Sequence, residues 1–121
     1  MDYRIETTED ATVVHLKGAF DRSARRTIEM ELLALVTNGS KLLIDLSEVD
    51  FISSAGLHLL LELYRRCAQQ NAHLALTSLS DPVHEILSIA GLTSRGLPIY
   101  DTVEEGLAAL RATTEKGNLS E

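Results

Sequence analysis

Residues 42–61 read LLIDLSEVDFISSAGLHLLL, with one apolar run at each end and a mixed segment between them. The first run, residues 41–46, is short and continuous, which is typical of a strand buried on both faces of a sheet. Residues 47–52 then form a connection to the adjacent hydroxyls of Ser53-Ser54, and helical spacing of apolar side chains begins after them. We therefore expect a central strand, a loop that carries two serines, and a helix over residues 57–70.

The expected helix has two faces of different polarity. Its apolar stripe would face the sheet, and its polar stripe would face solvent. The apolar stripe contains Leu57, Leu60, Leu61, Tyr64 and Ala68, and the polar stripe contains His58, Glu62, Arg65 and Gln69. Cys67 lies near the apolar stripe, so we expect a buried small apolar side chain there rather than a redox sensor.

Strands and helices alternate along the rest of the chain. Residues 3–7 and 12–18 alternate between apolar and polar side chains and predict an N-terminal hairpin. A helix over residues 21–36 can be capped by Asp21 or Ser23 and ends at Asn38-Gly39. The later elements are a strand over 72–79, a helix from Ser80-Asp81-Pro82 to Gly91, a strand over 97–100 and a last helix capped by Asp101 or Thr102.

This order of elements predicts one α/β domain. Strands that alternate with helices form parallel crossover units, so we expect a mixed sheet with the antiparallel hairpin at one edge. The expected domain covers residues 1–113 and contains about five strands and about four helices. Residues 114–121 carry a single apolar leucine, and we expect a flexible C-terminal tail there.

Composition narrows the function. The chain has 121 residues, 45% of them hydrophobic, and a net charge of −7, which disfavours binding to nucleic acid or to anionic lipid. No apolar run approaches the roughly 18 residues of a membrane span, and residues 1–10 do not resemble a secretory signal, so we expect a cytoplasmic protein with no membrane contact. One cysteine and four histidines on separate expected elements predict no disulfide and no metal site.

The loop with the two serines is the most informative place for function. Functional loops of an open α/β sheet gather beyond the carboxyl ends of the parallel strands, and this loop follows the central strand. A serine before a helix most often only caps it. However, the free N–H groups and the dipole of a helix start also favour a phosphate group, so either Ser53 or Ser54 could be a phosphorylation switch.

Residues 42–61 resemble the signature of STAS domains, the family of bacterial anti-sigma factor antagonists. The family pattern is a strand that ends in Asp/Asn-Leu-Ser, a loop with an aromatic-apolar pair, and Asp-Ser-Ser/Ala-Gly-Leu at the start of a helix. Two further segments, residues 16–21 (LKGAFD) and residues 89–92 (IAGL), resemble the family's Gly-x-Leu/Phe-Asp and Ser/Ala-Gly-Leu motifs. The resemblance covers nearly the whole chain and implies a STAS-like mixed sheet.

The resemblance implies a partner-switching module rather than an enzyme. In the family, the unmodified antagonist binds an anti-sigma factor that is itself an ATP-dependent serine kinase, and this binding frees the sigma factor. Phosphorylation of the antagonist ends the binding, and a serine phosphatase reverses it. The kinase supplies ATP and Mg²⁺, so the resemblance implies no cofactor for this chain.

The same resemblance assigns residues to the switch. The family's phosphorylated serine follows the Asp of the loop motif, and the matching position here is Ser54. Ser53 stands where the family has that Asp, which makes Ser53 the second candidate. The expected partner-binding residues are Asp21, Ser53, Ser54, Ala55, Gly56, Leu57 and His58. We expect four carboxylates to lie near the serines, and the negative charge of a phosphate there would add to theirs. They are those of Asp21, Asp45, Glu48 and Asp50.

Other readings of these residues have less support. A small-molecule or nucleotide-binding α/β domain remains an alternative, although the sequence has neither glycine-rich phosphate loop. A phosphoaspartate receiver built on Asp45 or Asp50 would need an acidic pair and a lysine that are not seen, and we expect the Asp45 carboxylate to reach a loop amide or the sheet end. A serine hydrolase built on Ser54 and His58 would need glycine where Ile52 stands. For Phe51 and Leu57, core packing is favoured over partner contact.

Overall fold

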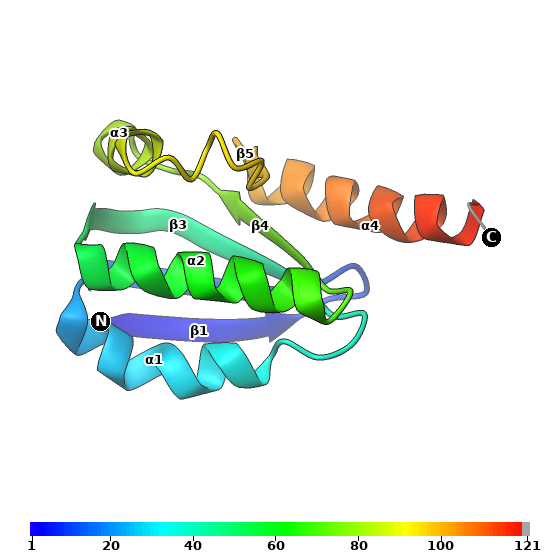
Figure 1. The fold of residues 1–121 in the computed structure, drawn as a ribbon, viewed down its shortest axis with the longest axis horizontal. Helices are drawn as coiled ribbons and strands as arrows, with labels where there is room; N and C mark the ends of the chain where they lie inside the picture. The colour runs from blue at the N-terminus through cyan, green and yellow to red at the C-terminus, as the bar shows by residue number, and fades with distance from the viewer. Residues whose placement is uncertain (120–121) are drawn as a thin grey trace.

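The computed structural model describes residues 1–119, and side-chain surroundings through residue 113. Nine elements follow one another in the predicted order (Figure 1). They are β1 (Asp2–Thr7), β2 (Thr12–Phe20), α1 (Arg22–Ala34), β3 (Lys41–Ile52), α2 (Ser54–Gln69), β4 (His73–Thr77), α3 (Asp81–Ile89), β5 (Ile99–Tyr100) and α4 (Val103–Leu119). The prediction of a single α/β domain with a mixed sheet is confirmed.

The five strands form one sheet in the order β1-β2-β3-β4-β5, with β3 in the centre as predicted. The hairpin of β1 and β2 is antiparallel, and Ile5 lies opposite Val14. All other pairs are parallel, because each of their connections carries a helix that returns the chain to the same end of the sheet. The carboxyl ends of β2, β3 and β4 therefore lie at the same end of the sheet, where α1, α2 and α3 begin.

Residues 47–52, predicted as a loop, belong to β3 instead. They continue the pairing with β2, from Lys17 opposite Glu48 to Phe20 opposite Ile52. The register shifts twice along this pair, between His15 and Lys17 and between Gly18 and Ala19. Such bulges insert residues and break the two-residue period of a strand, which explains why the sequence pattern did not indicate one here.

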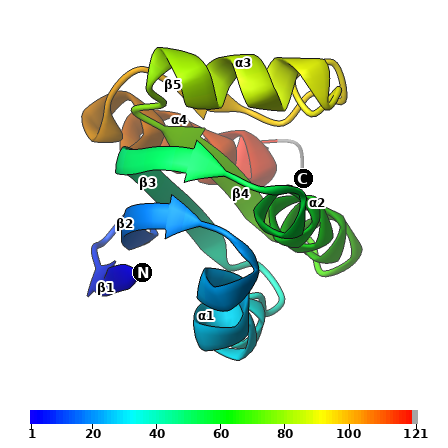
Figure 2. The same cartoon turned by 90° about the vertical axis from the view of Figure 1, so that its left-hand side faces the viewer.

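Helices cover both faces of the sheet (Figure 2). The main core joins side chains of α1, α2 and α3 to one face, with residues such as Ile28, Leu60 and Leu87 fully buried around Ile44. On the other face α4 packs against a smaller cluster that contains Val13, Leu43, Ala75 and Leu110. α3 lies at the end of the sheet where α2 begins, and Figure 1 shows it end-on. No helix in residues 1–119 is long and apolar enough to cross a membrane.

The prediction of which face of α2 is buried is wrong, because the buried face is rotated about the helix axis from the predicted apolar stripe. Leu59, Leu60, Leu63 and Cys67 are the side chains that α2 buries. Leu57, Leu61 and Tyr64 are only half-buried, and Ala68 is exposed. Five leucines among residues 57–63 make several stripes equally apolar, and only the packing of α2 against α1 and β4 selects one.

The structure describes most of the segment 114–121, for which a flexible tail is predicted. α4 extends through Leu119, so residues 114–119 of the expected tail have helical backbone. Residues 120 and 121 lie outside the described residues. Flexibility of the segment 114–121 stays a prediction.

Candidate functional site

The site forms where the ends of β2 and β3 meet the first turns of α1 and α2. The carbonyl of Phe20, the last residue of β2, accepts a hydrogen bond from the Ser53 N–H at 3.0 Å. The next residue, Asp21, caps α1 by accepting from the Ala24 N–H at 3.0 Å. The predicted role of Asp21 as a helix cap is confirmed. Asp21 directly follows Phe20, whose carbonyl oxygen holds the serine loop through the Ser53 N–H.

The two serines have different environments. Ser53 is the N-cap of α2 and is half-buried; its hydroxyl donates to the Phe20 carbonyl at 3.4 Å and accepts from the Gly56 N–H at 3.5 Å. Ser54 is the first residue of the helix and is exposed, and its hydroxyl makes no hydrogen bond within the described part of the chain. The helix cap is therefore Ser53, and the solvent-facing hydroxyl is that of Ser54.

Gly56 sets how closely α2 approaches β2. A Cβ atom at this position would lie 2.5 Å from the Phe20 carbonyl oxygen, 3.0 Å from Cγ of Phe20 and 3.1 Å from a methyl of Ile52. Backbone oxygen atoms cannot move aside as the end of a side chain can. The sequence placed Gly56 on the partner surface, whereas the structure buries it as the contact that seats the serine loop.

Arg25 is a part of the site that the sequence did not single out. Its guanidinium donates to the Ala55 carbonyl at 3.3 Å, forms an ion pair with Glu29 at 2.8 Å and lies 3.5 Å from Glu62. These contacts join the N-terminal part of α1 to α2 at Ala55 and Glu62. The spacing of Arg25 and Glu29 at i and i+4 was visible in the sequence, but the contact with Ala55 depends on the packing of two helices.

The two apolar residues that precede and follow the serines, Phe51 and Leu57, differ in burial. Phe51 is 49% exposed, so the expectation that core packing dominates there is wrong, whereas Leu57 is half-buried against the core. Phe51 lies on the extension of β3, whose outward side chains face solvent. His58 is exposed and lines a small groove with Leu57, and no hydrogen bond joins it to Ser54 among the described residues. The exposed ring of Phe51 thus belongs to a residue three positions before Ser54 in the chain.

Comparisons with known proteins show the family of this chain. The sequence model of the STAS domain family matches residues 2–106. The chain belongs to the STAS domain family. BtrV of Bordetella bronchiseptica, provisionally named an anti-sigma factor antagonist, is 29% identical over 112 residues, which cover 92% of this chain and 96% of that protein.

Solved structures share the fold of this STAS domain. An anti-sigma factor antagonist domain from Planctomyces limnophilus superimposes with a TM-score of 0.80 and 25% identity, covering 91% of this chain and 98% of that one. The cell fate determinant SpoIIAA of Bacillus, solved in its phosphorylated form, gives a TM-score of 0.71 at 20% identity, covering 91% of this chain and all of that one (100%). At this identity the second likeness shows the fold alone.

Asp45 of this STAS domain does not belong to the serine site. It is buried, and its carboxylate accepts from the Ser47 N–H at 3.0 Å and contacts His15 Nδ1 at 2.7 Å. The other ring nitrogen of His15 lies 3.0 Å from Glu6. The expectation that Asp45 reaches a nearby amide is confirmed. Its carboxylate is engaged with His15 and Ser47, so the idea that it adds charge beside Ser54 has no support.

We expect the stability contributed by Asp45 to depend on pH. Burial raises the pKa of this carboxyl, but the hydrogen bonds from Ser47 and His15 outweigh burial, and the pKa is lowered overall. A lowered pKa means that the contribution is complete above the unfolded-state value of about 4 and disappears as the pH falls through the folded-state value. Asp45→Asn should therefore reduce the free energy of unfolding by about 1–2 kcal/mol at pH 7 and by less at pH 3. Urea unfolding of both proteins at the two pH values measures this, and a difference that does not change with pH would contradict it.

Proposed function

We propose that this STAS domain is an anti-sigma factor antagonist that works in the cytoplasm by partner switching. In this proposal it binds an anti-sigma factor that is an ATP-dependent serine kinase while Ser54 is unmodified, and it is released when Ser54 is phosphorylated. A serine phosphatase restores the binding form. The chain itself acts as a binding module and not as an enzyme. The single observation that carries the proposal is the exposed Ser54 in the first turn of α2, whose hydroxyl has no hydrogen-bond partner among the residues that the structure describes.

The environment of the two serines favours Ser54 over Ser53 as the phosphoacceptor. A kinase must bring the hydroxyl oxygen in line with the γ-phosphate of ATP, so the hydroxyl must be free and accessible. The Ser53 hydroxyl is engaged with the Phe20 carbonyl and the Gly56 N–H, and phosphorylating it would remove the cap of α2. Ser54 can accept a phosphate without loss of any of these hydrogen bonds.

The same place explains why phosphorylation would change binding more than folding. A phosphate at the first residue of α2 meets free backbone N–H groups and the positive end of the helix dipole, which stabilise it within the domain. Toward a partner it presents about −1.5 to −2 charges on a surface that includes the half-exposed ring of Phe51. Removal of that charge from water, beside the carboxylate of Asp21, opposes contact.

The proposed partner surface contains Asp21, Ser54 and Phe51, together with the exposed His58. Ala55 and Leu57 flank Ser54 and would form the edge of the contact. Ser53 and Gly56 support the surface from below through their contacts with Phe20. The partner surface is thus a small patch around one helix start, held in place by the ends of two strands.

The first test is the site of phosphorylation. Incubation with ATP and the serine kinase encoded nearest to this gene should add one phosphate, and peptide mass spectrometry should place it on Ser54. Ser54→Ala should remain unmodified, while Ser53→Ala, the matched control, should still accept a phosphate on Ser54. Modification of Ser53 alone would show that the acceptor has moved to the neighbouring position, and modification of neither serine would contradict the switch.

A further inference from the structure

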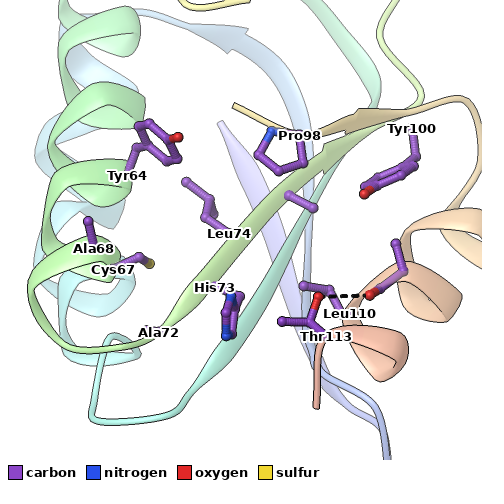
Figure 3. A pocket seen from close by; sticks show the side chains of 12 residues that line it. Tyr64, Cys67, Ala68, Ala72, His73, Leu74, Pro98, Tyr100, Leu110 and Thr113 are labelled. Carbon is purple, nitrogen blue, oxygen red and sulfur yellow. Dashed lines mark hydrogen bonds between the residues drawn. The ribbon is translucent and has the colours of Figure 1, made fainter. Parts of the chain in front are cut away.

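A second feature of the molecule lies far from Ser54, along the outer edge of β4. A cavity of about 280 Å³ opens there between α2 and α4 (Figure 3). Tyr64 and Ala68 of α2 line one side, Leu110 and Thr113 of α4 line the other, and Pro98 and Tyr100 close the end near β5. The cavity therefore lies along the edge of a strand, with a helix on each face of the sheet.

The floor of this cavity is a part of β4 beside which residues 1–119 place no strand. Within that range β5 pairs with β4 only at Leu76 and Thr77, so the first half of β4 is open on that side. Backbone groups of a strand point alternately to its two neighbours. The N–H of His73 donates to Ser40 on the β3 side, and the N–H of Leu76 donates to Pro98 on the β5 side. Leu74 therefore directs both its N–H and its C=O toward the cavity.

Pro98 explains why this pair of backbone groups is left open. If β5 were longer, the register of Leu76 with Ile99 would place residue 97 opposite Leu74, and residue 98 would donate its N–H to the Leu74 carbonyl. Proline has no N–H. The Leu74 N–H makes no hydrogen bond with the loop before β5 among the residues that the structure describes. Leu74 is only 3% exposed, and buried backbone donors and acceptors nearly always have a partner.

The rest of the cavity wall is mostly apolar, and its polar side chains are His73, Thr113 and the tyrosines Tyr64 and Tyr100. Burial raises the pKa of the Cys67 thiol to about 11, so this side chain lines the cavity as a small uncharged group. The hydroxyl of Thr113 is already engaged, since it donates to the Ala109 carbonyl at 3.0 Å. A ligand here would gain its polar contacts from the Leu74 peptide groups and its packing from the surrounding side chains.

We propose that this cavity is a binding site for a small planar molecule with a hydrogen-bond donor next to an acceptor, as in a cyclic secondary amide. The N–H of such an amide would donate to the Leu74 carbonyl, and its C=O would accept from the Leu74 N–H. Its flat ring would lie between the side chains of α2 and α4 in the place that a longer β5 would fill. The domain would then bind a small molecule at one end of α2 and its proposed partner at the opposite end.

Nuclear magnetic resonance on the ¹⁵N-labelled full chain can test this with two probes. Titration with 2-quinolinone should shift the Leu74 amide proton downfield in a saturable way, because that proton gains an acceptor. 1-Methyl-2-quinolinone keeps the ring and the carbonyl but has no N–H, so it should bind about tenfold more weakly, as expected for one lost hydrogen bond. Equal affinity of the two probes, or no saturable shift with either, would overturn the proposal.

A pair of variants on α4 tests the location. Ala109 lines the cavity and Ala108 is exposed, so Ala109→Phe should abolish binding of 2-quinolinone and Ala108→Phe should leave it unchanged. Thermal melts of both variants report whether they fold. If Ala109→Phe does not fold, the comparison of the two probes on the unmodified protein still decides the question. Unchanged binding to a folded Ala109→Phe would overturn the proposal.

Discussion

Ser54→Asp is expected to lower the affinity of this domain for the proposed kinase partner by about 30-fold or more, while the domain stays folded. An uncompensated charge in a protein contact costs on the order of 2–5 kcal/mol, and each 1.4 kcal/mol is about a factor of ten in affinity. Within the domain, the aspartate would stand at the first residue of α2, where the helix dipole favours a negative charge. The change in the free energy of unfolding should therefore remain within about 1 kcal/mol. Titration calorimetry against the kinase and thermal melts of the variant measure the two effects.

Two controls separate the charge from other consequences of the substitution. Ser54→Ala removes the hydroxyl without adding charge and should bind as the unmodified protein does. Asn38→Asp adds the same charge at an exposed turn before β3, at the opposite end of that strand from Ser54, and should also leave affinity unchanged. If Ser54→Asp folds and binds as tightly as the unmodified protein, the serine has no role in partner contact and the proposed function of this loop is wrong.

The order of strands and helices could be read from the sequence because local signals marked nearly every element. Asp21 before α1 and Pro82 in the first turn of α3 both mark helix starts, and the structure has helices there. The extension of β3 could not be predicted, since residues 47–52 follow bulges set by the pairing with β2. The buried face of α2 was also missed, because a run of leucines leaves the choice of face to neighbouring elements.

For the site, the sequence located the loop but did not show which serine caps α2 and which one faces solvent. Two adjacent serines look alike in a sequence, and only the position of the Phe20 carbonyl identifies Ser53 as the cap. The contact from Arg25 to the Ala55 carbonyl joins residues 30 positions apart and has no local signal. The exposure of Phe51 follows from the strand extension, which turns this side chain toward solvent.

The second large effect is expected from Gly56→Ala, which should destabilise the fold itself. The added methyl would lie 2.5 Å from the Phe20 carbonyl oxygen, and that oxygen also accepts the hydrogen bond of the Ser53 N–H. Relief of this overlap requires α2 to move away from β2, with loss of contacts at the end of the core. We expect a decrease of about 3 kcal/mol in the free energy of unfolding, at the upper end for overpacked sites, and a fall of roughly 10 °C in Tm.

Gly106→Ala on α4 is the matched comparison, since both glycines lie in helices and both changes gain a similar helix propensity of about 1 kcal/mol. The new methyl at position 106 would meet the methyl groups of Leu43 and Thr77 at 2.7 and 2.8 Å, and the Leu43 methyl can shift by rotation of its side chain, whereas a backbone oxygen cannot. Gly106→Ala should therefore lose less stability than Gly56→Ala in urea unfolding. Because a displaced α2 also moves Ser54 away from Asp21, Gly56→Ala should weaken binding to the proposed kinase partner even at temperatures where the variant is fully folded. A Gly56→Ala variant as stable as the unmodified protein would show that the close contact between Gly56 and the Phe20 carbonyl does not position the serine loop.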